Sequence, residues 1–354
     1  MGNGSPYLQN YGFVFFYLVG FVDLVFGDIF TTLKLVMAVT HVLSGLGMYR
    51  LTERLCHSRR AGFVAILGAP NAGKSTLVNR LVGAKVSIVS PKVQTTRARI
   101  RGIRVEGAAQ LVLVDTPGIF DNAKRRLERA MVYAAWSGAQ DADAILLLVD
   151  AMKGLDGNTK RIRDRLIKSG RKALIAINKI DQVSHENLLP LAAQLDDGVS
   201  AERIFMISAL GGQGVEDLLH HFLGLLPEGP WLYPEDQLSD ISERLLAAEI
   251  TREKLFLQLH QELPYSLAVE TETWRELKDG SLRIEQIVYV SRDAHKPMVL
   301  GKGGQRIKSV GQESRTELES LLDRRVHLFL FVKVREGWHD DPERYRDLDL
   351  EFNS

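Results

Sequence analysis

The sequence predicts an α/β protein in which a doubly wound sheet domain is followed by a smaller α+β domain. Short apolar segments, each running into a polar or glycine-containing loop, indicate the strands of the first domain. These segments are 63–67, 110–114, 173–177 and 203–207. Three prolines between Pro227 and Pro234 then interrupt the pattern. Beyond them the expected order becomes helix, strand, strand, glycine-rich loop, helix, strand, which predicts a separate second domain.

The composition supports a folded protein of about two domains, at roughly 150 residues per domain. The 354 residues are 45% hydrophobic and 25% charged, which excludes disorder for the bulk of the chain. The 45 basic and 44 acidic residues give a net charge of +1, so no global field indicates a polyanionic partner. The single cysteine, Cys56, excludes an intrachain disulfide framework and a cysteine-cluster zinc site, and a reducing cytoplasm is expected.

The first fifty residues have a different composition, because their only charges are Asp23, Asp28, Lys34 and Arg50. A membrane-spanning helix needs about 20 apolar residues. The first charge-free run reaches that length only by including its polar first ten residues. The next window must include both aspartates, whose burial in hydrocarbon is unfavourable.

Three interpretations of this segment stay open. Residues 1–58 are an apolar extension outside the functional fold, with the true start at Met37 or Met48, or a membrane-associated anchor, or an ordered helical appendage. If a helix inserted into a membrane here, the basic residues that follow it would keep the rest of the chain in the cytoplasm.

A phosphate-binding loop is predicted between the strand at 63–67 and a helix that begins near residue 74. Its sequence fits G-x-x-x-x-G-K-[ST] in the strand–loop–helix context that this motif requires. Backbone N–H groups of such a loop and the helix N-terminus bind phosphate oxygens. Lys74 is expected to reach the β- and γ-phosphates, and Ser75 to bind Mg²⁺. The candidate phosphate-binding residues are Gly68, Ala69, Pro70, Asn71, Ala72, Gly73, Lys74, Ser75 and Thr76.

The strand at 110–114 ends in D-T-P-G, where a carboxylate would lie at the ligand edge of the sheet. Asp115 would hold a water of Mg²⁺, and the N–H of Gly118 would meet the γ-phosphate. The candidate residues of this second switch are Asp115, Thr116, Pro117, Gly118 and Ile119.

The strand at 173–177 ends in N-K-I-D, which predicts selection of guanine. An aspartate carboxylate can accept hydrogen bonds from both the N1–H and the exocyclic amine of guanine, and adenine lacks this pair of donors. Lys179 would lie along the base plane, Asn178 would brace the loop, and the S-A-L segment after the next strand would reach the guanine oxygen. The candidate guanine-binding residues are Asn178, Lys179, Asp181, Ser208, Ala209 and Leu210.

A second glycine-rich loop, G-K-G-G at 301–304, lies before a helix and among basic residues. Such a loop lets backbone N–H groups approach the phosphates of single-stranded RNA. A long helix at 237–263, strands at 266–274, 282–290 and 325–334 and this loop resemble a type II KH module. The candidate RNA-binding residues are Gly301, Lys302, Gly303, Gly304, Arg306 and Lys308.

Together these motifs resemble the Era family of P-loop GTPases, within the translation-factor-related class. Q-T-T-R at 94–97, before a strand-like 100–105, resembles the first switch of that family, and the segments after D-T-P-G strengthen the resemblance. The resemblance implies Thr95 or Thr96 as the third Mg²⁺ ligand, beside Ser75 and Asp115. It covers about residues 60–338.

Two features bear on hydrolysis. Ile119 stands where Ras-type enzymes have a water-orienting glutamine, so no side chain is assigned as catalytic base. Asn71 resembles the potassium ligand of related cation-activated GTPases, and a turn-stabilising role is an equally open interpretation.

The resemblance implies a GTP-binding and GTP-hydrolysing protein that binds 16S rRNA near its 3′ end and assists 30S maturation. It implies GTP or GDP and Mg²⁺ as ligands, K⁺ as a further candidate, a cytoplasmic monomer and a peripheral fraction at the inner membrane. A membrane-associated regulatory GTPase is the alternative, and an RNA-binding protein with an inactive nucleotide site is a second one.

The expected domain organisation follows from these motifs: extension 1–58, GTPase domain 59–228, linker 229–236, KH domain 237–338 and tail 339–354. A run of cations without an intervening acid, from Lys92 to Arg104, is interpreted either as a solvated switch or as an rRNA contact.

Overall fold

The computed structural model describes residues 28–57, 59–93, 95–120, 126–197, 201–260, 263–338 and 350. Most of the expected tail 339–354, the first 27 residues and residues 121–125 lie outside this part. The chain divides into two compact units, residues 1–59 and residues 60–354, which are described separately.

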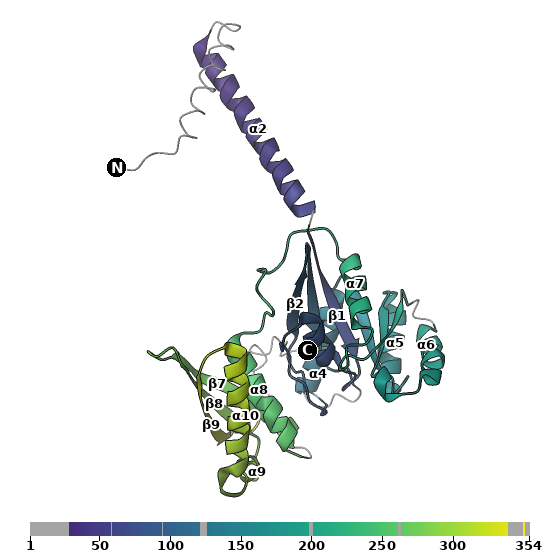
Figure 1. The fold of residues 1–354 in the computed structure, drawn as a ribbon, viewed down its shortest axis with the longest axis vertical. Coiled ribbons are helices and arrows are strands. Elements are labelled where there is room, and N and C mark those ends of the chain that lie inside the picture. Colours follow the sequence, from purple (N-terminus) through teal and green to yellow (C-terminus); the bar gives the residue numbers. More distant parts are fainter. Residues whose placement is uncertain are drawn as a thin grey trace. The chain divides into compact units, whose positions relative to one another are not determined.

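In the described part of the first unit, the chain forms the long helix α2 (Ile29–His57) (Figure 1). Its segment Phe30–Leu51 has 22 residues and a mean hydropathy of 1.3, which meets the length and composition of a membrane span. Neither window considered in the sequence was of this kind, because one included its polar first ten residues and the other included two aspartates. The helix supplies such a window because its apolar segment begins after Asp28 and continues past Lys34.

The sheet of the second unit has six strands in the order β2-β3-β1-β4-β5-β6. The strands are β1 (Arg60–Gly68), β2 (Ile100–Glu106), β3 (Ala109–Asp115), β4 (Ala144–Asp150), β5 (Leu174–Asn178) and β6 (Ile204–Ile207). All pairs are parallel except β2 with β3. Strand β4, which is almost wholly buried, was not predicted from the sequence.

Helices cover both faces of this sheet. They are α3 (Lys74–Val82), α4 (Arg126–Gln140), α5 (Gly157–Ser169), α6 (Leu188–Asp196) and α7 (Val215–Leu225). Alternate residues of β1 serve the two cores: Val64 and Ile66 pack with α3 and α7, whereas Ala65 and Leu67 pack with α4, α5 and α6. Because β1, β3, β4, β5 and β6 run parallel, their carboxyl ends lie at one edge of the sheet.

The proline-rich segment after α7 is bound along the edge of the sheet. The Gln110 side chain accepts hydrogen bonds from the N–H groups of Leu232 (2.7 Å) and Tyr233 (3.0 Å), and it donates one to the Tyr233 carbonyl. Further on, Ser239 pairs with Gly102 of β2. These contacts hold the segment between α7 and α8 against β2 and β3.

The C-terminal part forms a three-stranded sheet in the order β7-β8-β9, with β8 and β9 parallel. Its elements are α8 (Glu243–Gln258), β7 (Leu267–Glu276), β8 (Leu282–Val290), α9 (His295–Leu300), α10 (Gln305–Leu322) and β9 (Val326–Val334). The predicted helix at 237–263 was too long at both ends. Ser242 caps α8 through the N–H of Leu245, because the residues before it run along β2.

Candidate nucleotide site

A cavity of about 370 Å³ lies at the carboxyl edge of the large sheet. Among its lining residues are Pro70, Asn71, Gly73, Lys74, Ser75, Thr76, Thr95, Thr96, Gly118, Asn178, Lys179, Asp181, Ser208, Ala209 and Leu210. The candidate residues of the phosphate, switch and guanine motifs are thus brought together. The segment 88–92 also lines the cavity, and no motif in the sequence marked it.

The phosphate loop folds tightly over β1. Gly73 has a φ of 98°, and a Cβ there would lie 2.3 Å from the amide nitrogen of Asn178, so the position requires glycine. Lys74 donates to the carbonyls of Gly68 and Ala69, both at 3.1 Å. Burial lowers the pKa of the Lys74 ammonium from 10.5 to about 8, against the opposing charge of Asp115.

Oxygen atoms converge on Asp115. Its Oδ2 accepts hydrogen bonds from Ser75 (2.7 Å) and Ser87 (2.7 Å), and Thr96 Oγ1 lies 3.3 Å away. Its Oδ1 is buried and has no hydrogen-bond partner among the described residues. Burial raises the pKa of this carboxyl, while the bonds from Ser87 and Ser75 oppose that shift.

This donor set fits Mg²⁺, which prefers hard oxygen ligands. Of the two candidate threonines, Thr96 reaches the cluster, since its hydroxyl lies 2.8 Å from Ser75 Oγ. Thr95 instead contacts Ser90 and the carbonyl of Lys92, both at 2.6 Å. Sequence reasoning missed Ser87, because no motif includes it.

The opposite end of the cavity carries the N-K-I-D motif. Asn178 joins two loops, because its amide donates to the Ala72 carbonyl and accepts from the Ala209 N–H, both at 2.8 Å. A hydrogen bond from the Ser208 side chain holds the pKa of Asp181 below its usual value, which favours the ionised carboxylate. Arg80 of α3, missed in the sequence, donates to the carbonyls of Ala209 and Leu210.

No general base stands beside the expected γ-phosphate position among the described residues. Ile119 is 7% exposed and packs into the core with Ala65 and Leu67. Gly118 lies so close to Pro70 that a Cβ added to Gly118 would be 3.0 Å from the Cα of Pro70. The geometry supports catalysis by positioning and charge stabilisation.

The switch segment, which we define as residues 85–96, contacts the C-terminal domain directly. Glu253 of α8 accepts a hydrogen bond from the Val89 N–H at 2.7 Å and pairs with Lys85 at 2.5 Å. Arg252, paired with Glu249, donates to the carbonyl of Thr95. Helix α8 thus holds both ends of the segment that includes Thr95.

The interpretation of the cation run from Lys92 to Arg104 as a solvated switch is wrong for three of its side chains, and contact of the run with rRNA stays a prediction. Lys92 donates to the backbone carbonyls of Phe256 and Leu259, and Arg97 to that of Leu267 at 2.9 Å. Arg101 pairs with Asp240 at 2.7 Å. These side chains join the two domains, because backbone carbonyls and a carboxylate of the second domain lie opposite them.

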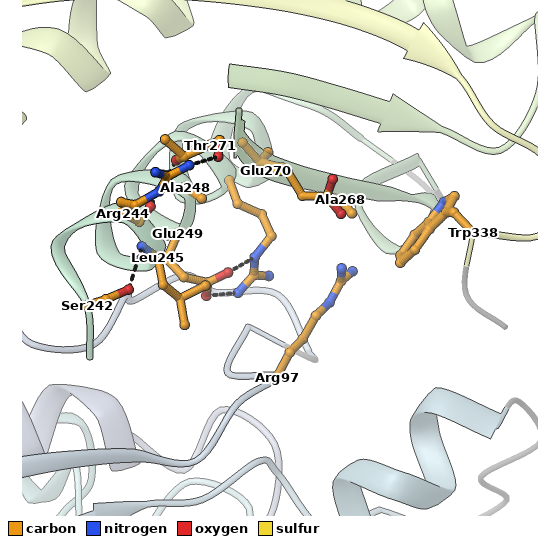
Figure 2. A pocket seen from close by; sticks show the side chains of 12 residues that line it. Arg97, Ser242, Arg244, Leu245, Ala248, Glu249, Ala268, Glu270, Thr271 and Trp338 are labelled. Atoms are coloured by element: carbon orange, nitrogen blue, oxygen red, sulfur yellow. Dashed lines mark hydrogen bonds and ion pairs between the residues drawn. The ribbon is translucent and has the colours of Figure 1, made fainter. Parts of the chain in front are cut away.

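Figure 2 shows Arg97 extending into a second cavity, between α8, β7 and Trp338. This cavity has a volume of about 390 Å³. The Arg97 guanidinium lies 5.6 Å from the Trp338 ring centre and 5.9 Å from that of Phe256. This second cavity lies at the interface of the two domains and is separate from the nucleotide cavity.

The G-K-G-G loop joins α9 to α10. Gly301, Gly303 and Gly304 all have positive φ, at 74°, 59° and 77°, which glycine tolerates best. Lys302 and Lys308 are exposed, whereas Arg306 is half-buried and donates to the Met298 carbonyl. The loop and the first turn of α10 therefore present Lys302 and Lys308 to solvent, and Arg306 supports the turn.

Comparison with known proteins agrees with both halves of this geometry. Residues 63–179 match the family described as 50S ribosome-binding GTPase, and residues 262–339 match the KH domain. The chain is 60% identical over 293 residues to GTPase Era of Rhizobium meliloti, covering 83% of this chain and 93% of the relative. It is 61% identical to that of Agrobacterium fabrum, with 83% and 92% covered. This chain belongs to the Era family of GTPases.

Two solved Era structures share the fold of this family member at 40% identity and a TM-score of 0.78, with 82% of this chain and 98% of theirs covered. One is Era in complex with MgGDPNP and nucleotides 1506–1542 of 16S ribosomal RNA. The other is a single-residue variant of Aquifex aeolicus Era bound to GDP·AlF4⁻. This Era-family chain is a GTPase, and the alternative of a membrane-associated regulatory GTPase is not favoured.

Proposed function

We propose that this Era-family GTPase binds single-stranded 16S rRNA near its 3′ end and assists assembly of the 30S subunit. The observation that supports this proposal most directly is that one compact unit holds both the nucleotide cavity and a KH loop flanked by the exposed Lys302 and Lys308. The Era structure with 16S rRNA nucleotides 1506–1542 supports the choice of RNA.

In the proposed reaction, the loop N–H groups and Lys74 hold the phosphates. Ser75, Thr96 and Asp115 would hold Mg²⁺, whose bound charge would offset the charge that develops on the γ-phosphate. Asp181 selects guanine, and Asn178 keeps the guanine loop and the phosphate loop in register. Water attacks without an assigned protein base.

We also propose that RNA binding responds to the bound nucleotide. The switch segment and α8 share the contacts of Glu253 and Arg252, so a change in the order of that segment on hydrolysis would shift α8. The chain works in the cytoplasm as a monomer, and α2 gives a fraction of it contact with the inner membrane.

Crosslinking to RNA in cells tests the function. Wild-type chain is expected to crosslink at the 3′ end of 16S rRNA, and Lys302→Glu with Lys308→Glu should remove that crosslink. Lys160→Glu with Lys168→Glu, at two exposed lysines of α5, serves as the charge-matched control. Unchanged crosslinking in the double variant would refute the role of the loop.

The membrane fraction has a separate test. Removal of residues 1–47 is expected to shift all of the protein to the supernatant after membrane sedimentation. A membrane fraction of unchanged size in the truncated protein would exclude α2 as its cause.

A further inference from the structure

The C-terminal sheet has two unlike faces. One packs against α8 and α10 and includes the buried Val288 and Val290 (Figure 1). The strand register places the other set of side chains on the opposite face. These are Arg283, Glu285, Ile287 and Tyr289 of β8 and His327, Phe329, Phe331 and Lys333 of β9.

Two phenylalanines are exposed on this second face. Phe329 is 43% exposed and Phe331 is 47% exposed, and they lie two residues apart on the same side of β9. The guanidinium of Arg283 lies 4.9 Å from the ring centre of Phe329. Aromatic side chains at adjacent same-face positions of a strand form a flat apolar surface that favours a flat ligand.

Cations surround these rings. Arg275 of β7 lies opposite Arg283 of β8 in the strand register, and Lys333 follows Phe331 along β9. Glu285 is the acidic residue closest in register to Phe329, and Arg283 binds it at 2.6 Å. Exposed aromatic rings among cations are typical of surfaces that bind single-stranded nucleic acid, where bases stack and phosphates pair with the cations.

The surface also adjoins the proposed RNA groove. β9 is an edge strand of the sheet, and its covered face contacts α9 and α10, the helices that flank the G-K-G-G loop. A KH loop holds about four nucleotides. The RNA in the solved Era complex, nucleotides 1506–1542, is far longer, so a bound strand must continue beyond such a groove.

We propose that Phe329 and Phe331 form a base-stacking platform for the single-stranded RNA that leaves the G-K-G-G groove across the edge of β9. Lys333 pairs with the phosphate backbone of the same strand. The platform adds affinity for long RNA and carries little sequence preference, because every base has a face that can stack. This inference rests on the RNA-binding function proposed above.

The test measures the affinity of the full chain for two RNAs by fluorescence anisotropy. One is nucleotides 1506–1542 of 16S rRNA, and the other is the shortest single-stranded piece of it whose binding depends on Lys302. Phe329→Ala with Phe331→Ala is expected to weaken binding of the long RNA by about 10- to 100-fold, from the loss of one or two stacked bases. Binding of the short RNA should stay within about twofold, which corresponds to an energy below that of one stacked base.

Two further variants separate stacking from folding. Phe331→Trp should retain the affinity of the wild type, and the long RNA should quench the tryptophan emission that this variant adds. Tyr133→Ala removes an aromatic side chain of the same exposure, 47%, from α4 and should leave both affinities unchanged.

The opposing results are distinct. Each of three results would overturn the platform. The double variant could bind the long RNA with unchanged affinity, or lose affinity equally for both RNAs. It could also lose the binding of another protein while its affinity for RNA stays intact. If Lys302→Glu abolishes binding while the phenylalanine variants bind normally, only this inference fails. If the wild-type chain binds neither RNA, the proposed function fails with it.

Discussion

The Glu253 carboxylate on α8 accepts a hydrogen bond from the backbone N–H of Val89 at 2.7 Å. Val89 lies in the segment that lines the nucleotide cavity, whereas Glu253 belongs to the KH domain. Glu253 also pairs with Lys85, which contacts Glu317 of α10. One buried carboxylate therefore joins the nucleotide cavity to the two helices that cover the C-terminal sheet.

Glu253→Gln should loosen this segment. The amide keeps the shape of the side chain but removes the charge-assisted bonds to Val89 and Lys85, which are stronger than neutral ones. We expect the Val89 amide to exchange with deuterium at least about fivefold faster, from the loss of about 1 kcal/mol. Glu272→Gln, an exposed change on β7, should leave that rate unaltered, and equal rates in both variants would contradict the role of Glu253.

Nucleotide binding should take up a proton near pH 8. Burial lowers the pKa of Lys74 from 10.5 to about 8 in the nucleotide-free protein, so the folded state loses its proton before the unfolded state does. Stability from this group therefore rises as pH increases from about 8 towards 10.5. Phosphates restore the charged form, so about half a proton should be taken up per nucleotide at pH 8.

Calorimetry of GDP binding at a fixed Mg²⁺ concentration in two buffers of different ionisation enthalpy measures this uptake. Lys74→Arg stays charged throughout and should show none. Equal apparent binding enthalpies for the wild-type chain in the two buffers would rule out a lowered pKa for Lys74.

Ser87→Ala should weaken Mg²⁺ binding. The Ser87 hydroxyl donates to Asp115 Oδ2 at 2.7 Å and holds that carboxylate in place. Loss of such an outer partner costs about 10- to 100-fold in metal affinity. The Mg²⁺ concentration for half-maximal GTP hydrolysis should rise accordingly, while Ser184→Ala, at an exposed serine, should not change it.

Potassium should accelerate hydrolysis if Asn71 binds it. Asn71 has a φ of 64° and its amide donates to the Pro91 carbonyl at 2.7 Å, which also accounts for a purely structural role. Asn71→Gly keeps that backbone conformation available and removes the side chain. We expect faster turnover in K⁺ than in Na⁺ for the wild type and equal rates for the variant, and equal wild-type rates would leave only the structural role.

The motifs could be predicted from the sequence because each consists of consecutive residues whose types suit one chemically demanding ligand. A predicted strand before each motif was enough to identify the phosphate loop, the Asp115 segment and the N-K-I-D segment. Ser87 and Arg80 act through contacts that are local in space and distant in sequence, at 28 and 129 residues. No pattern around either residue marks such a partner.

The cations between Lys92 and Arg104 show a second limit. Their charge alone suggested solvent or RNA, yet Lys92 and Arg97 bind backbone carbonyls of the second domain. Backbone acceptors are present in every sequence, so complementarity of this kind cannot be seen in composition. The start of α8 was misjudged for a related reason, since residues 238–240 continue the amphipathic pattern but bind the backbone of β2.

In the proposed function, nucleotide state and RNA binding are coupled through α8. The most direct test is the dissociation constant of the full chain for nucleotides 1506–1542 of 16S rRNA, measured with GDP and with a non-hydrolysable GTP analogue. We predict that the two constants differ, and that Glu253→Gln reduces the difference. Identical constants for the two nucleotide states of the wild type would contradict the coupling.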